Sequence, residues 1–251
     1  QNIKLSDCVN RIKESPTLAI TAKAAKLKSE GKDIIGLAAG EPDFDTPDFI
    51  KDAAIKAIKS GLTKYTPVPG LASLRKAVIK KFKRDNNLNY EMNEIIVGVG
   101  GKQCIFNFFL ALLNPGDEVI IPTPYWVSYT DIVELTSGSP VLINCGIEQS
   151  FKMTPQQLES SINKKTKIVV LNSPSNPTGS VYSKNELQDL SKILLKYPNI
   201  YILTDDIYEH IRLDDQPFHN IVMVEPNLKN RCIIINGVSK AYSMTGWRIG
   251  F

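Results

Sequence analysis

The chain has 251 residues, of which 43% are hydrophobic, and a formal net charge of +4 at pH 7. This composition indicates a globular protein with one sizeable core, or with one large domain and a small appendage. Nucleic-acid binding is disfavoured, because the charge is mild and the most basic run, Lys80 to Arg84, is interrupted by Phe82 as on a solvated helix face.

The cysteines, the histidines and the apolar runs indicate the compartment and exclude some classes of site. Four widely spaced cysteines without a CxxC pair favour free thiols in a reducing compartment: Cys8, Cys104, Cys145 and Cys232. We expect no zinc site, since His210 and His219 do not have the spacing of a metal pair on one helix. No apolar run is long enough to span a bilayer and the N-terminal residues do not resemble a leader, so we expect a cytoplasmic protein without a membrane anchor.

Short apolar runs alternate with longer helix-like runs from residue 94 onward, after an N-terminal part in which we expect irregular structure. The runs rich in Val and Ile lack polar alternation, which is typical of strands covered on both faces. We therefore predict an α/β fold, with a mostly parallel sheet and helices on both faces. Helices are predicted at Gln103–Leu113 and Glu186–Leu195, and strands at Glu94–Val99, Glu118–Ile121, Lys167–Leu171, Ile200–Leu203 and Cys232–Ile235.

The segment Ala39 to Pro47 is dense in Pro, Gly and Asp. Such a composition is typical of a loop between structural units. It marks the predicted boundary between a small N-terminal portion and the main domain.

Unusual residues follow the first three predicted strands, at the edge where parallel sheets bind ligands. Gly98 to Lys102 lead into a helix whose free N–H groups suit a phosphate, whereas a dinucleotide motif would need a third glycine at Gln103. Trp126 follows a rigid proline turn and is a candidate stacking platform for a flat ring. Asn176 lies in the turn Asn172 to Gly179, which two prolines fix, and can donate a hydrogen bond.

Charged groups follow the last two predicted strands. Asp205 ends a hydrophobic strand, where a carboxylate needs a charged or hydrogen-bonded partner such as a protonated ring nitrogen. Lys240 lies in a small-residue turn with Arg248 nearby in sequence, and a desolvated lysine near a cation has a lowered pKa that makes it nucleophilic towards aldehydes. Each feature alone also has an ordinary explanation as a turn, a loop or a core side chain. Together they match the groups that pyridoxal phosphate needs.

The segments that carry these residues resemble class I aminotransferases, and among them the aspartate aminotransferases of bacterial type. In family order they read AGEPDFDTP, KYTPVPG, VGGKQ, PYWVSY, NSPSNPTG, TDDIYEH and GVSKAYSMTGWRIGF, and the resemblance covers nearly the whole chain. It implies that residues 1–45 belong to a small domain and residues 46–251 to a large cofactor-binding domain. It also implies a homodimer with shared active sites.

The resemblance assigns roles around the cofactor ring. Lys240 would form the Schiff base and then move the proton between the substrate α-carbon and the cofactor. Asp205 would keep the ring nitrogen protonated, while Tyr208 and Asn176 would bond the phenolic oxygen of the ring. Trp126 would stack on the ring, and both Trp126 and Asn176 would also face the substrate.

Further roles concern the phosphate and the substrate. The backbone N–H groups of Gly101 and Lys102 would cradle the phosphate, with Arg248 as its bidentate partner. Tyr65 would reach the phosphate of the neighbouring subunit, and Gly40 would touch the substrate carboxylate through its backbone. The Lys102 side chain is either a surface lysine or the partner for the distal carboxylate of a dicarboxylic substrate.

Two departures from the family pattern stand out. Gly237 occupies the position where many relatives carry a serine that donates to the phosphate, and Ser239 is not assumed to replace it. Relatives continue beyond the position of Phe251 through a C-terminal small domain, which includes the arginine that pairs with the substrate α-carboxylate. We therefore expect a truncated or incomplete enzyme.

The predicted activity is the reversible transfer of an amino group between L-aspartate and 2-oxoglutarate. Prephenate/glutamate or aromatic amination remains an alternative, with Ser15 to Thr17 as a candidate specificity segment. A lyase or synthase reaction on the same scaffold is a second alternative. A non-catalytic cofactor-binding module is a third, which the lack of a helix-turn-helix arm or basic extension before residue 40 disfavours.

Overall fold

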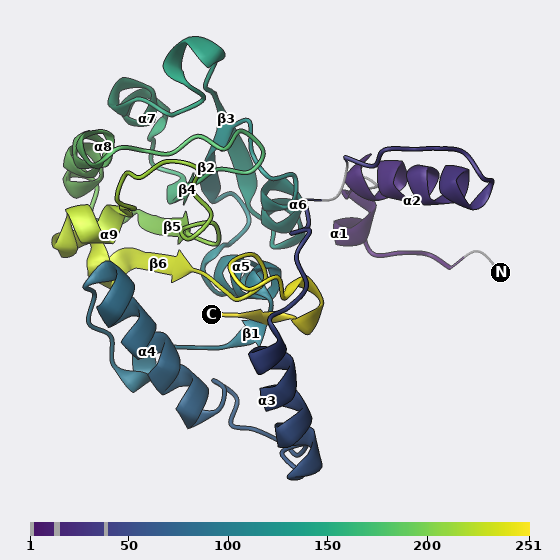
Figure 1. Cartoon of the computed structure of the whole chain (residues 1–251). Coiled ribbons are helices and arrows are strands. Elements are labelled where there is room, and N and C mark those ends of the chain that lie inside the picture. Colours follow the sequence, from purple (N-terminus) through teal and green to yellow (C-terminus); the bar gives the residue numbers. More distant parts are fainter. Residues whose placement is uncertain (1–2, 13–15, 38–39) are drawn as a thin grey trace.

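The computed structural model of the chain describes residues 3–12, 16–37 and 40–251 (Figure 1). Its main sheet has five parallel strands in the order β3-β2-β4-β5-β6. The predicted α/β class with a mostly parallel sheet is thus confirmed. The strands are β2 (Glu118–Thr123), β3 (Ser139–Asn144), β4 (Thr166–Asn172), β5 (Tyr201–Asp205) and β6 (Cys232–Ile235).

Two hydrophobic clusters cover opposite faces of this sheet. On β2, Val119 and Ile121 belong to one cluster and Ile120 to the other, as the alternation of side chains along a strand requires. Helices α5 (Gly101–Leu112) and α6 (Ser128–Leu135) contribute to the first cluster, and α7 (Pro155–Ser161) and α8 (Lys184–Lys196) to the second. Helices therefore lie on both faces, as predicted.

The N-terminal part is helical, so the expectation of irregular structure there is wrong. It contains α1 (Asp7–Asn10), α2 (Pro16–Ser29), α3 (Asp48–Lys59) and α4 (Ala72–Asn86), and α1 and α2 lie to the side of the main sheet (Figure 1). The apolar residues of α3 recur at helical spacing, as Ile55 and Ile58 do, which indicates a helix although both side chains are exposed. The remaining short elements are η1 (Met92–Glu94), η2 (Ile147–Gln149), α9 (Ile221–Val224), η3 (Pro226–Arg231) and η4 (Thr245–Trp247).

One predicted strand is much shorter than expected, and one strand was not predicted. The run Glu94–Val99 contains only the two-residue strand β1 (Gly98–Val99), which pairs antiparallel with β7 (Ile249–Gly250). Strand β3 was not predicted; it is an edge strand in which Leu142 is 50% exposed, and it contains Pro140. An edge strand tolerates proline and exposure because one side of its backbone has no partner strand.

Helix α4 contains the basic run Lys80 to Arg84, which is only partly a solvated face. Phe82 is 3% exposed and makes edge contacts with Tyr90 and Phe251. The side chain of Lys81 is also largely buried and pairs with Glu209. The run therefore presents one side to solvent and anchors α4 to the core with the other.

Three of the thiols predicted to pack as small hydrophobes are buried and unpaired: Cys104, Cys145 and Cys232. Cys8 is a partly exposed free cysteine on α1. None of the helices within the described ranges combines the length and apolarity needed to cross a bilayer.

A buried ionic network joins α4 to the loops after β5 and β6. The carboxylate of Glu209 pairs with Lys81, accepts from the Asn86 amide at 3.0 Å and accepts from the Asn236 amide at 2.9 Å. Burial alone would raise the pKa of Glu209, but its hydrogen bond with His210 and the charge of Lys81 outweigh burial and lower the pKa to about 2. The network therefore stabilises the fold through an ionised carboxylate.

We expect Glu209→Gln to lower the free energy of unfolding by about 3 kcal/mol at pH 7, because it leaves the buried Lys81 charge without its partner. The folded-state pKa of Glu209 lies below its ordinary value of 4.5, so this stabilisation is complete above pH 4.5 and is lost as pH falls towards about 2. Urea denaturation should thus show the difference between wild type and variant shrinking over that pH window.

Glu159→Gln provides the matched control, because Glu159 and its partner Lys196 have side chains that are 42% and 56% exposed. An exposed pair of this kind contributes about 0–1 kcal/mol. An equal loss of unfolding free energy in the two variants would contradict the role assigned to the Glu209 network.

Candidate functional site

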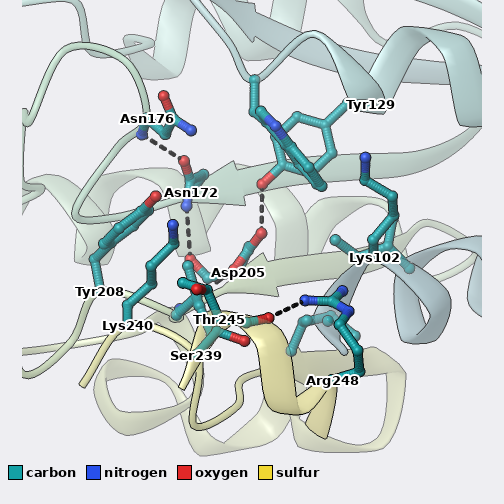
Figure 2. Close-up of a pocket in the computed structure, with 15 residues that line it drawn as sticks. Lys102, Tyr129, Asn172, Asn176, Asp205, Tyr208, Ser239, Lys240, Thr245 and Arg248 are labelled. Atoms are coloured by element: carbon teal, nitrogen blue, oxygen red, sulfur yellow. Dashed lines mark hydrogen bonds between the residues drawn. The ribbon is translucent and has the colours of Figure 1, made fainter. Parts of the chain in front are cut away.

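A cavity of about 270 Å³ opens at the carboxyl ends of the parallel strands (Figure 2). It brings together most of the residues predicted from sequence: Gly101, Lys102, Trp126, Asn176, Asp205, Tyr208, Lys240 and Arg248. Asp205 ends β5, Gly101 and Lys102 begin α5 after β1, and the other residues lie in segments that follow β2, β4, β5 and β6. They converge because parallel strands present their carboxyl ends at one edge of the sheet.

Lys240 reaches the cavity from the loop after β6. Its Nζ donates a hydrogen bond to the carbonyl oxygen of Gly40 and lies 5.9 Å from the ring centroid of Tyr208. Burial lowers the pKa of Lys240, and the nearby Arg248 charge lowers it further against the opposing effect of Glu41. A larger fraction of this amine is therefore neutral and nucleophilic than for a solvated lysine.

Asp205 lies at the end of β5 and faces the cavity with a carboxyl group that is almost wholly buried. Its Oδ2 accepts from the hydroxyl of Tyr129 at 2.6 Å (Figure 2), and its Oδ1 accepts from the N–H of Ile207 at 3.2 Å. Burial raises the pKa of Asp205 in spite of these two donors. The carboxyl group thus lacks a positive partner among the side chains that bond it.

The neighbouring Asp206 points to the other side of β5. It accepts from the hydroxyl of Thr204 at 2.8 Å and from the amide of Asn220 at 2.7 Å. Burial raises the pKa of Asp206 to about 8. Since Asp206 does not line the cavity, Asp205 is the carboxyl group that the strand presents to a ligand.

An anion cradle forms where β1 turns into α5. Gly101 and Lys102 are the first residues of α5, so their N–H groups have no acceptor within the helix. Gly100 has a φ of +81°, and a Cβ at this position would collide with the Arg248 guanidinium. The glycine therefore lets Arg248 approach the start of α5. Arg248 also donates to the carbonyl oxygen of Thr245 at 2.8 Å.

Trp126 forms part of the cavity wall. Its ring packs edge-on against Tyr129, with centroids 5.4 Å apart, and Lys102 Nζ lies 5.0 Å from its centroid. Across the cavity, burial raises the pKa of the Tyr208 hydroxyl and the Asp205 charge adds to this, whereas contact with the Asn176 amide lowers it. The cavity thus combines an aromatic wall with a hydroxyl and an amide that can donate hydrogen bonds.

Two predicted residues lie outside the cavity lining. Tyr65 is fully exposed, and Gly40 contacts Lys240 through its carbonyl oxygen. The candidate specificity segment begins at Ser15, which lies outside the described residues, as does Ala39 of the predicted boundary.

The departure at Gly237 has a steric explanation. A Cβ at this position would lie 2.8 Å from the carbonyl oxygen of Ile249, so a serine would require the backbone to shift. The side chains that line the cavity nearby are Ser239 and Thr245.

Sequence reasoning missed four polar residues of the lining: Tyr129, Asn172, Ser239 and Thr245. Tyr129 lies on α6, three residues after Trp126 and within the motif PYWVSY, which was the available signal. Asn172 is the first residue of the turn that holds Asn176 and could have been found as a polar residue ending an apolar strand. The contacts of both with Asp205 depend on tertiary packing.

The sequence is similar to that of known proteins over most of its length. Residues 32–251 match the family model described as aminotransferase class I and II. The aspartate/prephenate aminotransferase of Nitrosomonas europaea is 62% identical over 249 residues, which are 99% of this chain and 63% of that protein. A probable aspartate/prephenate aminotransferase of Rickettsia felis is 58% identical, covering 98% of this chain and 60% of that protein.

Solved structures of other proteins have a similar backbone fold. The aspartate aminotransferase of Rhizobium meliloti has a TM-score of 0.96 at 51% identity, covering 99% of this chain and 62% of that one. The Thermus thermophilus aspartate aminotransferase with maleate has a TM-score of 0.94 at 43% identity, covering 99% and 64%. This chain spans less than two thirds of the length of these relatives. Its match over residues 32–251 shows that it belongs to the class I and II aminotransferase family.

Proposed function

We propose that the protein carrying this chain transfers an amino group reversibly between L-aspartate and 2-oxoglutarate, with pyridoxal phosphate as cofactor. The observation that carries the proposal is the convergence of Lys240 and Asp205 on one cavity. One is an amine with a lowered pKa, and the other is a buried carboxyl group that pairs with no cation among the described residues. The names of the similar proteins support the reaction class.

The donor set of the cavity fits pyridoxal phosphate. When bound, this group supplies an aldehyde that captures an amine and a ring that withdraws electrons. Asp205 would hold the proton on the ring nitrogen, because a buried carboxylate is stabilised by an adjacent positive charge. Trp126 would lie against the ring, and Asn176 and Tyr208 would bond its phenolic oxygen.

The phosphate would lie in the anion cradle at the start of α5. The N–H groups of Gly101 and Lys102 point from the helix N-terminus, where the helix dipole favours an anion. Arg248 would add a bidentate charged contact. The collision that any Cβ on Gly100 would make with Arg248 supports this packing of the cradle.

Lys240 would carry out the proton transfer. Its Nζ would take the proton from the α-carbon of the amino acid, a task that requires an uncharged amine. Burial favours the uncharged form, because it lowers the pKa of Lys240. Its hydrogen bond to the Gly40 carbonyl oxygen holds the side chain beside the segment that would meet the substrate.

The substrate would be a dicarboxylic amino acid. Lys102 offers a positive charge at the cavity wall for the distal carboxylate, close to the Trp126 ring. The similar aspartate aminotransferase of Thermus thermophilus was solved with maleate, which is a dicarboxylate. Prephenate is the second candidate, because the 62% identical relative is named for both aspartate and prephenate.

We also propose a cytoplasmic homodimer in which residues 1–45 belong to a small domain. The exposed apolar side chains on and after α3 support a partner on this face: Phe49, Ile55, Ile58 and Leu62. Tyr65 follows them and would reach the neighbouring subunit. The position of α1 and α2 beside the main sheet supports the domain boundary (Figure 1).

In the intact protein, pyridoxal phosphate followed by borohydride should label Lys240, as mapped by mass spectrometry of the peptides. Lys240→Ala should lose this label and at least about 10²–10⁴-fold in turnover, because both the nucleophile and the proton carrier are gone. The exposed Lys192→Ala should retain the label on Lys240. Labelling elsewhere in wild type, with Lys240 unmodified, would end the proposal.

Substrate choice can be tested at Lys102. We expect Lys102→Met to lower kcat/KM for aspartate by roughly 10- to 100-fold, because a charged hydrogen bond is lost. The kcat/KM for alanine, which has no distal carboxylate, should stay nearly unchanged. The backbone N–H of residue 102 remains in this variant. Equal turnover of alanine, tyrosine and aspartate by wild type would contradict the assignment to aspartate.

A further inference from the structure

We propose that Asn172 is a positioning residue that fixes Asp205 and Asn176 relative to each other; this inference rests on the function proposed above. Its Nδ2 donates to the main-chain carbonyl oxygen of Asp205 at 2.9 Å, and its Oδ1 accepts from the main-chain N–H of Asn176 at 2.8 Å. Figure 2 shows both bonds made by the same amide, between the two residues.

The strand register creates this bridge. Asn172 and Asp205 are the last partners of the parallel β4–β5 pair. Beyond this point β4 turns into the loop that carries Asn176, and the backbone ladder ends. The Asn172 side chain therefore continues the link between β4 and β5 where the main chain no longer provides one.

The chemistry of the bridge requires an amide. An asparagine side chain donates at one end and accepts at the other, whereas an ionised aspartate only accepts and a leucine does neither. Aspartate would also place a negative charge beside Asp205, whose carboxyl group is already almost wholly buried. Asparagine is thus the residue of this size that satisfies both contacts.

The bridge has a consequence for binding a flat ring. Asp205 would bond the ring nitrogen and Asn176 the phenolic oxygen, so the two side chains must keep a fixed separation. Functional groups held by supporting hydrogen bonds bind with less loss of freedom than groups on a mobile loop. Without Asn172 both side chains would remain, but the loop that carries Asn176 would lose its tie to β5.

The test compares Asn172→Leu and Asn172→Asp in the intact protein, using pyridoxal phosphate affinity and the pH dependence of the absorbance of the bound cofactor. We expect each variant to bind roughly tenfold or more weakly, since one or two hydrogen bonds are lost. We also expect the pH midpoint of the absorbance to rise by about one unit, because a loosened Asn176 donor leaves the phenolic oxygen more basic.

Two controls separate positioning from folding. Asn144→Asp changes an exposed asparagine at the end of the edge strand β3, outside the cavity lining, and should behave as wild type. Asn172→Gln keeps both ends of the amide on a longer chain and should recover part of the affinity. Equal losses in the Leu, Asp and Gln variants, with a lower Tm before cofactor is added, would mark a folding role and overturn the proposal.

Failure of this inference differs from failure of the proposed function. Wild type that binds pyridoxal phosphate, together with Asn172 variants of unchanged affinity and unchanged midpoint, leaves the function standing and refutes the role of Asn172. Wild type that does not bind pyridoxal phosphate refutes both.

Discussion

The common direction of the five strands is the constraint on which the site depends. Parallel strands buried on both faces are mostly apolar along their length, so the polar groups that can meet a ligand gather where the strands end. In this chain the ends of β4 and β5 supply Asn172 and Asp205, and the loop after β6 supplies Lys240. One edge of the sheet therefore collects the reactive groups of segments that are far apart in the sequence.

Two buried carboxyl groups of this fold, those of Glu209 and Asp205, have pKa values shifted in opposite directions. The Glu209 carboxylate is compensated inside the protein by His210, Lys81 and two amides, and its pKa is lowered to about 2. The Asp205 carboxyl group accepts from one hydroxyl and one backbone N–H, and its pKa is raised. A fully compensated carboxylate stabilises the fold, whereas an uncompensated one facing a cavity is suited to a ligand that brings positive charge.

Residues 40–46 connect the site to the N-terminal part of the chain. The Gly40 carbonyl oxygen accepts from Lys240, and the Glu41 carboxylate accepts from the Thr245 hydroxyl. Thr46 donates to the Ser243 carbonyl oxygen at 2.6 Å and accepts from the Trp247 indole at 3.1 Å. A segment that lies about 200 residues earlier in the sequence thus borders the loop that carries the lysine.

The sequence by itself determined the fold class, the strands β2, β4, β5 and β6, and the residues at their ends, because apolar runs and the groups that interrupt them are local features. It did not reveal β3, whose exposure and proline hide the pattern, or the helices of the N-terminal part. Only the tertiary structure decided that Tyr129 bonds Asp205 across 76 residues and that Asn172 joins the end of β5 to the loop that carries Asn176. Such contacts depend on strand register and helix packing, which no local propensity encodes.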